Sequence, residues 1–305
     1  MNRNYCFLIL IATLAISCKS KENKEDGPFR GELSIYADSA IKPLVEEEIA
    51  GFTLLYNKAE IIPTYSGQSD VYGALLDNKV SLIIGARPLD TLEKQYFAKQ
   101  QLFPDVFHIA TDAIVLITSK SNIDTLMSDV EMKEIASGRW TNWTQVPGPF
   151  AGSEIDMVFD TKKSGMVSAL KEMLHIDSFG AKTFAVDSTW EAIEYVATHP
   201  NALGIIGYNT ISNMNIEQMS LFKSKVNIVY VSKDKSKDFY SPDQSNIATG
   251  NYPFVRKLYA ISREAKWGLA SSFLTYINGE KGQRILLKAG LIPASNPGRE
   301  VIIRQ

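Results

Sequence analysis

The sequence predicts an α/β protein of two lobes, each with a mixed, mainly parallel sheet flanked by helices. Short apolar runs alternate along the chain with segments whose apolar residues recur every three or four positions, as in β-α-β units. A polar turn at 119–122 follows an apolar strand, and we expect the chain to cross from the first lobe to the second there. The length of 305 residues and the hydrophobic fraction of 45% allow ample core for two lobes.

The first lobe is expected to begin with three successive pairs of strand and helix. The helix at 41–56 has its apolar residues at helical spacing, and its charged run Glu46-Glu47-Glu48 is expected on the solvated face. The expected elements of this segment are strands at 33–36, 60–64, 82–84 and 112–118, and helices at 41–56, 71–76 and 92–100.

The second segment has its own rhythm of strands and helices. The strand at 226–231 is expected to return toward the first lobe, and the polar residues 232–251 are expected to form a loop. Lobe 1 is therefore predicted to comprise 30–118 plus 253–305, and lobe 2 to comprise 119–252. The remaining elements are expected as strands at 156–159, 202–207, 226–231 and 255–261, and helices at 130–137, 167–174, 190–198, 267–278 and 280–289.

The first residues have the pattern of a secretion signal, predicted at 1–17, followed by a charged tether at 18–29. Residues 7–16 form an apolar run that is too short to span a bilayer comfortably. Small residues precede Cys18, as in a bacterial lipoprotein signal, where the cysteine carries acyl chains such as palmitate. The pattern predicts a lipid-anchored protein of the cell envelope that faces the periplasm or the exterior. An ordinary secretory peptide with an incidental cysteine is the alternative.

Composition and residue types argue against several function classes. The formal net charge of −2 lacks the basic surplus typical of nucleic-acid binders. Both cysteines, Cys6 and Cys18, lie in the leader, so the body has no thiol for a disulfide, a metal or nucleophilic chemistry. No pair of histidines has metal-like spacing, and neither a Gly-x-Ser-x-Gly elbow nor a P-loop occurs. We therefore expect no enzymatic activity, no metal and no cofactor.

Four loops share one arrangement, in which hydroxyl or glycine residues lie between the end of a strand and the start of a helix. Helix N-termini present free N–H groups and a partial positive charge, which together favour anions. Arg87 adds a planar fork suited to two oxygens of a tetrahedral anion. Because open α/β sheets bind ligands at the carboxyl ends of their strands, we expect these loops to converge. The candidate ligand-binding residues are Asp38, Ser39, Ser66, Gly67, Ser69, Arg87, Ser164 and Gly165.

Each candidate also has an ordinary structural role open to it. The serines could be helix N-caps, the glycines could serve turns, and Arg87 could form a surface ion pair. Trp140 and Trp143 are expected to be core and turn residues of lobe 2, with a stacking platform for a sugar as the alternative.

The order and spacing of motifs from Gly31 to Ala294 resemble the periplasmic phosphate-binding (PstS-like) proteins of ABC transporters. The resemblance implies a two-lobed periplasmic-binding-protein clamp, type II-like, that holds phosphate or a similar oxyanion between its lobes and delivers it to an ABC permease. Carried over by match, the donors are Ser39, Ser66 or Ser69 with Gly67, and Ser164-Gly165. The motifs are Gly31-Glu32-Leu33-Ser34, Asp38-Ser39, Ser66-Gly67-Gln68-Ser69, Ile84-Gly85-Ala86-Arg87-Pro88-Leu89, and the stretches 135–143, 201–208, 252–254 and 282–293.

Two positions depart from the family pattern. Asp160 stands where the family often has an arginine, and Ala86-Arg87-Pro88 stands where many members have an aspartate that accepts the proton of hydrogen phosphate. These departures raise the hypothesis that Arg87 replaces the missing arginine, and they predict weak rejection of sulfate. Two alternatives stay open: a ligand-less clamp used as a signalling or scaffold lipoprotein, and a phosphatase-like hydrolase, for which the sequence shows no nucleophile or metal site.

Overall fold

The computed structural model describes residues 27–161, 165–234, 236–264 and 267–295. The predicted signal peptide, Cys18 and Ser164 lie outside these residues. Within them, no helix combines the length and the apolar character that crossing a membrane requires.

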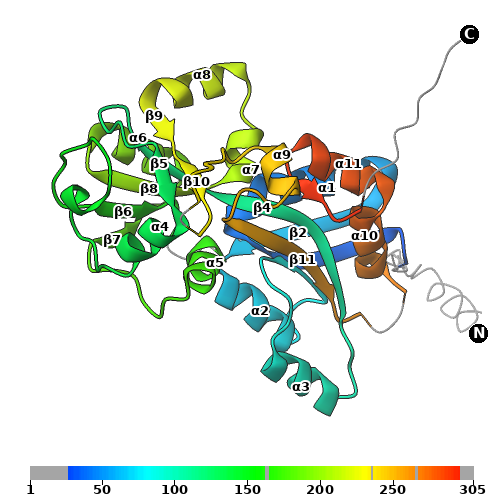
Figure 1. Ribbon diagram of the computed structural model, residues 1–305. Helices are drawn as coiled ribbons and strands as arrows, with labels where there is room; N and C mark the ends of the chain where they lie inside the picture. The colour runs from blue at the N-terminus through cyan, green and yellow to red at the C-terminus, as the bar shows by residue number, and fades with distance from the viewer. Residues whose placement is uncertain (1–26, 162–164, 235, 265–266, 296–305) are drawn as a thin grey trace, which may run out of the picture.

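A sheet of ten strands runs through both lobes (Figure 1). Its strands are β1 (Arg30–Asp38), β2 (Lys58–Ser66), β3 (Leu82–Gly85), β4 (Asp105–Ser119), β6 (Asp156–Phe159), β7 (Thr183–Ala185), β8 (Ala202–Gly207), β9 (Val226–Ile228), β11 (Val255–Ser262) and β12 (Ile292–Pro293). They lie in the order β2-β1-β3-β11-β4-β8-β6-β7, with β9 and β12 also paired to β4. β1, β2 and β3 are parallel to one another, as are β6, β7 and β8, while β11 and β4 run antiparallel to their neighbours. The predicted mixed α/β sheet is confirmed.

The long strand β4 joins the two lobes. Its residues up to Ala113 pair with β11, and its residues from Ile114 to Thr118 pair with β8. The change of partners therefore lies inside β4, before the polar turn at 119–122 to which the sequence assigned the crossing. The division of the chain at 118/119 and 252/253 stays a prediction.

Helices cover both faces of each half of the sheet (Figure 1). They are α1 (Lys42–Leu55), α2 (Gln68–Leu76), α3 (Thr91–Lys99), α4 (Asp129–Ala136), α5 (Gly165–Leu174), α6 (Thr189–Thr198), α7 (Tyr208–Ser212), α8 (Ile216–Lys225), α9 (Gln244–Ala248), α10 (Leu269–Asn278) and α11 (Glu280–Lys288), with 3-10 turns at Ser39–Ile41 and Trp143–Gln145. In lobe 1, α1, α10 and α11 pack on one face and α2 and α3 on the other. In lobe 2, α4 and α5 face one core and α6 and α8 the other.

Alternation along β4 explains how one strand serves two cores. Ile114 and Leu116 contribute to the core under α4 and α5, while Val115 and Ile117 contribute to the core under α6. Successive side chains of a strand point to opposite faces, so a strand that is covered on both sides is apolar throughout. This is why the sequence shows a continuous apolar run in this part of the chain.

The return segment after α8 differs from its prediction. The strand expected at 226–231 is two short strands, β9 and β10 (Tyr230–Ser232), and both stay in lobe 2. β9 pairs with β4, and β10 pairs with β5 (Leu126–Ser128) in a separate two-stranded sheet. The segment 232–251, expected as a loop, contains the short helix α9.

One residue of the acidic run in α1, Glu48, lies on the buried face of the helix, whereas the sequence predicted the solvated face. Glu48 is buried, with 2% of its surface exposed, although a solvated position was expected. It follows Leu44 and precedes Phe52 at four-residue spacing, and residues so spaced share one face of a helix. Both Leu44 and Phe52 belong to the core, so Glu48 is carried into it. Trp143, in contrast, is fully buried as the sequence predicted.

Candidate interlobe binding site

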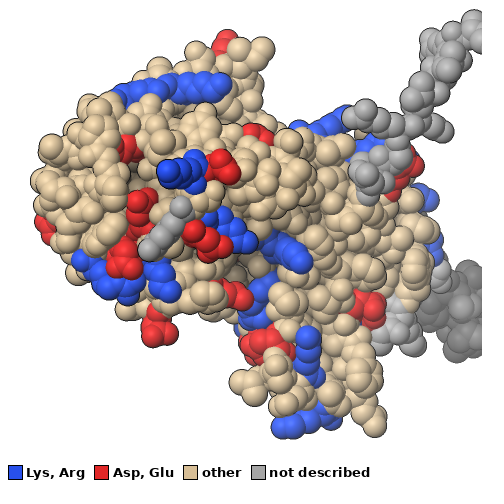
Figure 2. Space-filling model, in the orientation of Figure 1, with Lys and Arg blue, Asp and Glu red and all other residues tan. Residues whose placement is uncertain are grey.

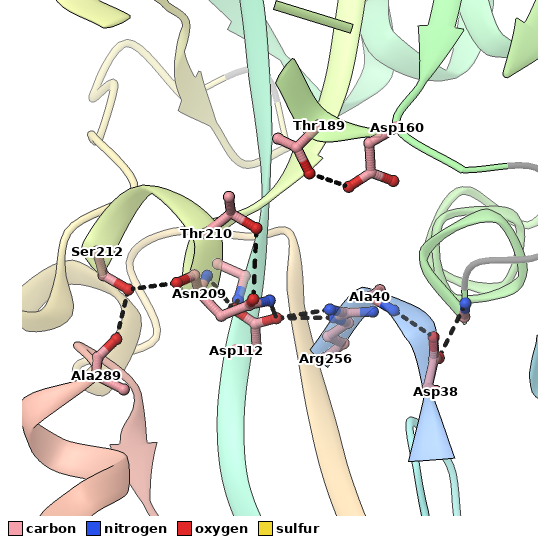
Figure 3. A network of polar contacts seen from close by, with 12 residues as sticks. Asp38, Ala40, Asp112, Asp160, Thr189, Asn209, Thr210, Ser212, Arg256 and Ala289 are labelled. Atoms are coloured by element: carbon pink, nitrogen blue, oxygen red, sulfur yellow. Dashed lines mark hydrogen bonds and ion pairs between the residues drawn. The ribbon is translucent and has the colours of Figure 1, made fainter. Parts of the chain in front are cut away.

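Asp38 connects the two lobes through its carboxylate. It ends β1, is fully buried, and accepts the Ala40 N–H at Oδ1 over 3.0 Å. Its Oδ2 accepts the N–H of Gly165, the first residue of α5, also over 3.0 Å (Figure 3). The first N–H groups of a helix lack intrahelical partners, so this donor is free for a partner outside the helix. A Cβ on Gly165 would lie 2.2 Å from Asp38 Oδ2, which makes glycine necessary for this approach.

Arg256 is the buried cation of this region. It extends from β11, its side chain is 1% exposed, and its Nε and Nη2 donate to Asp112 Oδ2 over 3.0 and 2.7 Å. Asp112 lies on β4 and also accepts N–H groups from Ala113 and from Asn209, the latter through both its backbone and its side chain. The third guanidinium nitrogen, Arg256 Nη1, has no hydrogen-bond partner among the described residues.

Two further carboxylates share the field of Arg256. Figure 3 shows Arg256 between Asp112 and Asp38, with Asp160 reaching toward them from lobe 2. Asp160 follows β6 and accepts the Thr189 hydroxyl over 3.2 Å at Oδ2. Its Oδ1 and the neighbouring Thr161 hydroxyl are buried without partners in the ranges that the structure describes. A buried polar atom left unpaired costs about 1–3 kcal/mol, so this set of donors and acceptors suits a small polar ligand.

Burial and the charge of Arg256 shift the pKa values of the carboxyls in the site. Burial raises the pKa of Asp38, and the charge of Arg256 opposes that rise. Burial likewise raises the pKa of Asp160 to about 7, with Arg256 and the Thr189 hydroxyl opposing the rise. Burial disfavours the charged form of Arg256, but Asp112, Asp38 and Asp160 together raise its pKa. Among the described residues, the site therefore offers Arg256 as a permanent cation and, in Asp160, a carboxyl that gains or loses a proton near neutral pH.

The sequence-predicted residues divide into two groups. Asp38 and Gly165 meet directly, Ser39 lies in the 3-10 turn beside them, and Gly67 is the buried N-cap residue of α2. The first turn of α2 approaches the same place, because Gln68 Oε1 would lie 3.0 Å from a Cβ on Gly165.

Ser66 and Ser69 line a separate hollow of about 400 Å³ on lobe 1. The hydroxyl of Ser66 donates to Asp70 over 2.6 Å, and Ser69 is exposed. Ser66 is the register partner of Asp38 in the pairing of β1 with β2, but its hydroxyl bonds to Asp70, and both serines line this hollow.

Arg87 is held on lobe 1 by Glu93. Its Nη1 and Nη2 each donate to the Glu93 carboxylate over 2.7 Å, and the guanidinium stacks on Tyr72 at 3.8 Å from the ring centre. Glu93 is fixed in turn by the capping box that it forms with Asp90 at the start of α3. The cation beside Asp38 and Asp160 is thus Arg256, and the ordinary ion-pair role that the sequence left open for Arg87 is the one seen here.

Sequence reasoning missed Arg256, Asp112 and Asn209, and it named Asp160 only as a departure from a pattern. A signal was present for the first two: each is a charged residue in a strand that also carries several apolar residues, and a charge in such a strand indicates a buried ion pair. Within the described parts of the chain, no group of three or more His, Cys, Asp or Glu residues is placed to hold a metal ion.

Comparison with known proteins agrees with this architecture. The chain is 23% identical over 293 residues to the phosphate-binding protein PstS of Borreliella burgdorferi, covering 93% of this chain and 95% of the relative. It is 23% identical over 299 residues to the phosphate-binding protein PstS of Bacillus subtilis, covering 95% and 91%.

Solved structures show the same fold. A structure from Clostridium perfringens, assigned as a phosphate ABC transporter substrate-binding protein with bound phosphate, has a TM-score of 0.71 at 24% identity, with 87% of this chain and 100% of that chain covered. An ABC-type phosphate transport receptor from Vibrio cholerae has a TM-score of 0.70 at 16% identity, with 86% and 100% covered. A family model described as the PBP superfamily domain matches residues 22–281, and the chain therefore belongs to the PBP superfamily.

Proposed function

We propose that this protein captures inorganic phosphate, or a similar tetrahedral oxyanion, between its lobes and delivers it to an ABC permease without chemical turnover. The observation that carries the proposal is the buried, unpaired Nη1 of Arg256 beside Asp38 and Asp160, at the contact between the lobes. The names of the PstS relatives support the choice of phosphate.

A ligand in this site would close the two lobes, because the groups that bind it come from both. Asp38 and Arg256 come from strands of the first half of the sheet, whereas Gly165 and Asp160 come from lobe 2. An anion that bonds to both sets stabilises the closed arrangement over the open one, because a ligand shifts an equilibrium toward the form it binds better. The closed form is then the one that docks on the permease.

The carboxylates supply selectivity for a protonated anion. Hydrogen phosphate can donate its proton to Asp38 or Asp160 when that side chain is ionised, while sulfate carries no proton at neutral pH and leaves the ionised carboxylate unpaired and repelled. A buried acceptor left unpaired is what discriminates between ligands of the same shape. We therefore expect strong rejection of sulfate, in place of the weak rejection that the sequence suggested.

Thermal melts test this proposal. The protein is dialysed exhaustively and titrated in parallel with phosphate, sulfate and molybdate. A ligand that binds only the folded state adds about 2.7 kcal/mol of stability at a hundredfold excess over its Kd. We expect a shift with phosphate, which Arg256→Lys removes and the matched control Arg87→Lys retains. A shift that depends on Arg87 and not on Arg256 would refute the assignment of the site.

One observation favours the ligand-less clamp as a second candidate. Asp38 already accepts the Gly165 N–H, and among the described residues of the site three carboxyl groups, those of Asp38, Asp112 and Asp160, surround the guanidinium of Arg256. A clamp closed by its own aspartate would serve as a signalling or scaffold protein. Absence of a melting shift with all three anions would favour this function.

We further propose that Cys18 carries the lipid anchor and that the protein faces the periplasm or the exterior. The small residues before Cys18 and the charged tether after it support this proposal. Metabolic labelling with a palmitate analogue should mark the wild-type protein and leave Cys18→Ala unlabelled and released from membranes. Labelling that persists in Cys18→Ala would contradict the anchor.

A further inference from the structure

A groove of about 600 Å³ opens between the lobes beside the candidate site. Its walls come from three places: the loop after β3, the outer turns of α5, and the start of β11. Figure 2 shows a hollow between α5 and β11 with both basic and acidic side chains around it. Because both lobes contribute, the groove exists only when they are close together.

The groove is continuous with the anion site. Arg256, whose unpaired Nη1 marks that site, also lines the groove. Ala86 lines the groove as well, and its Cβ would lie 3.1 Å from a Cβ on Gly165. The groove therefore begins at the residues that surround the Asp38–Gly165 contact.

The chemistry of the groove differs from that of the buried site. Leu89, Met173, Val255 and Tyr259 give it apolar and aromatic walls. Arg87, Asp90 and Glu172 also line it, and Lys257 is exposed on its edge. Ligand pockets for small organic molecules have volumes of roughly 300–1,000 Å³, lined mostly by apolar and aromatic side chains with a few polar groups. A bare tetrahedral anion fills only the polar end of such a space.

We propose that the ligand is a phosphate monoester whose phosphoryl head binds at Arg256 and whose small apolar or aromatic group lies in this groove. The proposal rests on the anion site described under the proposed function. The ester oxygen keeps the head tetrahedral and anionic, and the organic group exchanges water for Met173, Val255 and Tyr259. Inorganic phosphate binds the same head site with lower affinity.

Calorimetric titration with inorganic phosphate and with phenyl phosphate tests the inference. The mature protein is produced with its own leader and purified in mild detergent. Phenyl phosphate is expected to bind on the order of tenfold more tightly, the discrimination that a small apolar contact supplies, and to compete with phosphate for one site. Ala169→Phe fills the groove from α5 and should remove the preference for the ester while leaving phosphate affinity unchanged.

Ser168→Phe is the matched control, because Ser168 precedes Ala169 on α5 and is exposed outside the groove. It should keep the ester preference. Met173→Ala provides a second test if Ala169→Phe fails to fold, and it should weaken the ester several-fold and leave phosphate unaffected.

Phosphate binding without a preference for phenyl phosphate would overturn the groove inference and leave the proposed function standing. An equal loss of both ligands in Ala169→Phe would overturn it too. If neither ligand bound the wild-type protein, the proposed anion site would be contradicted, and the groove inference would fail with it.

Discussion

The carboxylate of Asp38 and the backbone N–H of Gly165 form a hydrogen bond of 3.0 Å across the two lobes. The acceptor ends the first strand of the sheet, and the donor begins α5. A carboxylate at a helix N-terminus also gains from the helix dipole. This contact brings Arg256 of β11 and Asp160 of lobe 2 into one buried cluster. The site therefore depends on the hydrogen bond between Asp38 and Gly165.

Substitution of Gly165 by alanine should open this contact. The new Cβ would lie 2.2 Å from Asp38 Oδ2, a distance that forces the carboxylate or the helix to move. We expect phosphate affinity to fall by at least about tenfold, or about 1.4 kcal/mol, in a calorimetric titration. Gly73→Ala in α2 is the control, because a Cβ there meets nothing within 4 Å. Equal affinities for Gly165→Ala and the wild type would show that the contact does not support binding.

Removal of the Arg256 cation should destabilise the fold strongly. Its side chain and that of Asp112 are 1% and 0% exposed, and loss of one partner of a buried pair costs about 3–5 kcal/mol because the other charge stays buried. Arg256→Met should show this loss in urea unfolding. Arg87→Met breaks an ion pair whose side chains are 28% and 10% exposed, and it should cost about 1–2 kcal/mol. A larger loss for Arg87→Met would contradict the assignment of Arg256 as the central cation.

Asp160 should make folding stability depend on pH. Its pKa is raised by burial from 3.8 to about 7. Below about pH 4 both the folded and the unfolded states hold the proton; as pH rises toward 7 only the folded state keeps it, so stability falls by up to about 1.4 kcal/mol per pH unit. Asp160→Asn should flatten this slope in melts without ligand between pH 4 and 7. Burial raises the pKa of Asp38 as well, so part of the slope should remain. An unchanged slope would mean that Asp160 is ionised in the folded protein.

Glu48, in the core of lobe 1, should also make folding stability depend on pH. Burial raises its pKa to about 9, and neither carboxyl oxygen has a hydrogen-bond partner in the described chain. Stability should fall as pH rises from about 4.5 to 9, because the unfolded state loses the proton that the folded state retains. Glu48→Gln should remove this decline and raise the melting temperature at pH 8, whereas Glu46→Gln, at an exposed position, should keep the wild-type profile. A lower melting temperature for Glu48→Gln at pH 8 would contradict the buried, protonated state.

Periodicity predicted most of the fold because most elements carry one clearly apolar face. The first half of β4 was missed, since Asp105, Val106 and Phe107 are all exposed and show no alternation. α8 was missed for a related reason: Phe222 is its one buried residue, and Ile216 is 90% exposed. Elements that bury few side chains show no periodic pattern of apolar residues, and the sequence therefore does not predict them.

The candidate site was only half predictable. Asp38 and Gly165 were found because each stands at the junction of a strand or loop with a helix, a local feature. Arg256 and Asp112 lie 144 residues apart in the chain, and neither strand alone reveals its partner. Arg87 was favoured because it lies in a loop beside a strand end, but the partner that holds it, Glu93, acts through the capping box of the next helix.

A crystal structure of the protein grown with phosphate is the most direct test of the central claim. The account predicts tetrahedral density between the lobes, within hydrogen-bond distance of Arg256 Nη1 and close to Asp38 and Asp160. Density beside Ser66 and Ser69 or on Arg87, with none at Arg256, would contradict it.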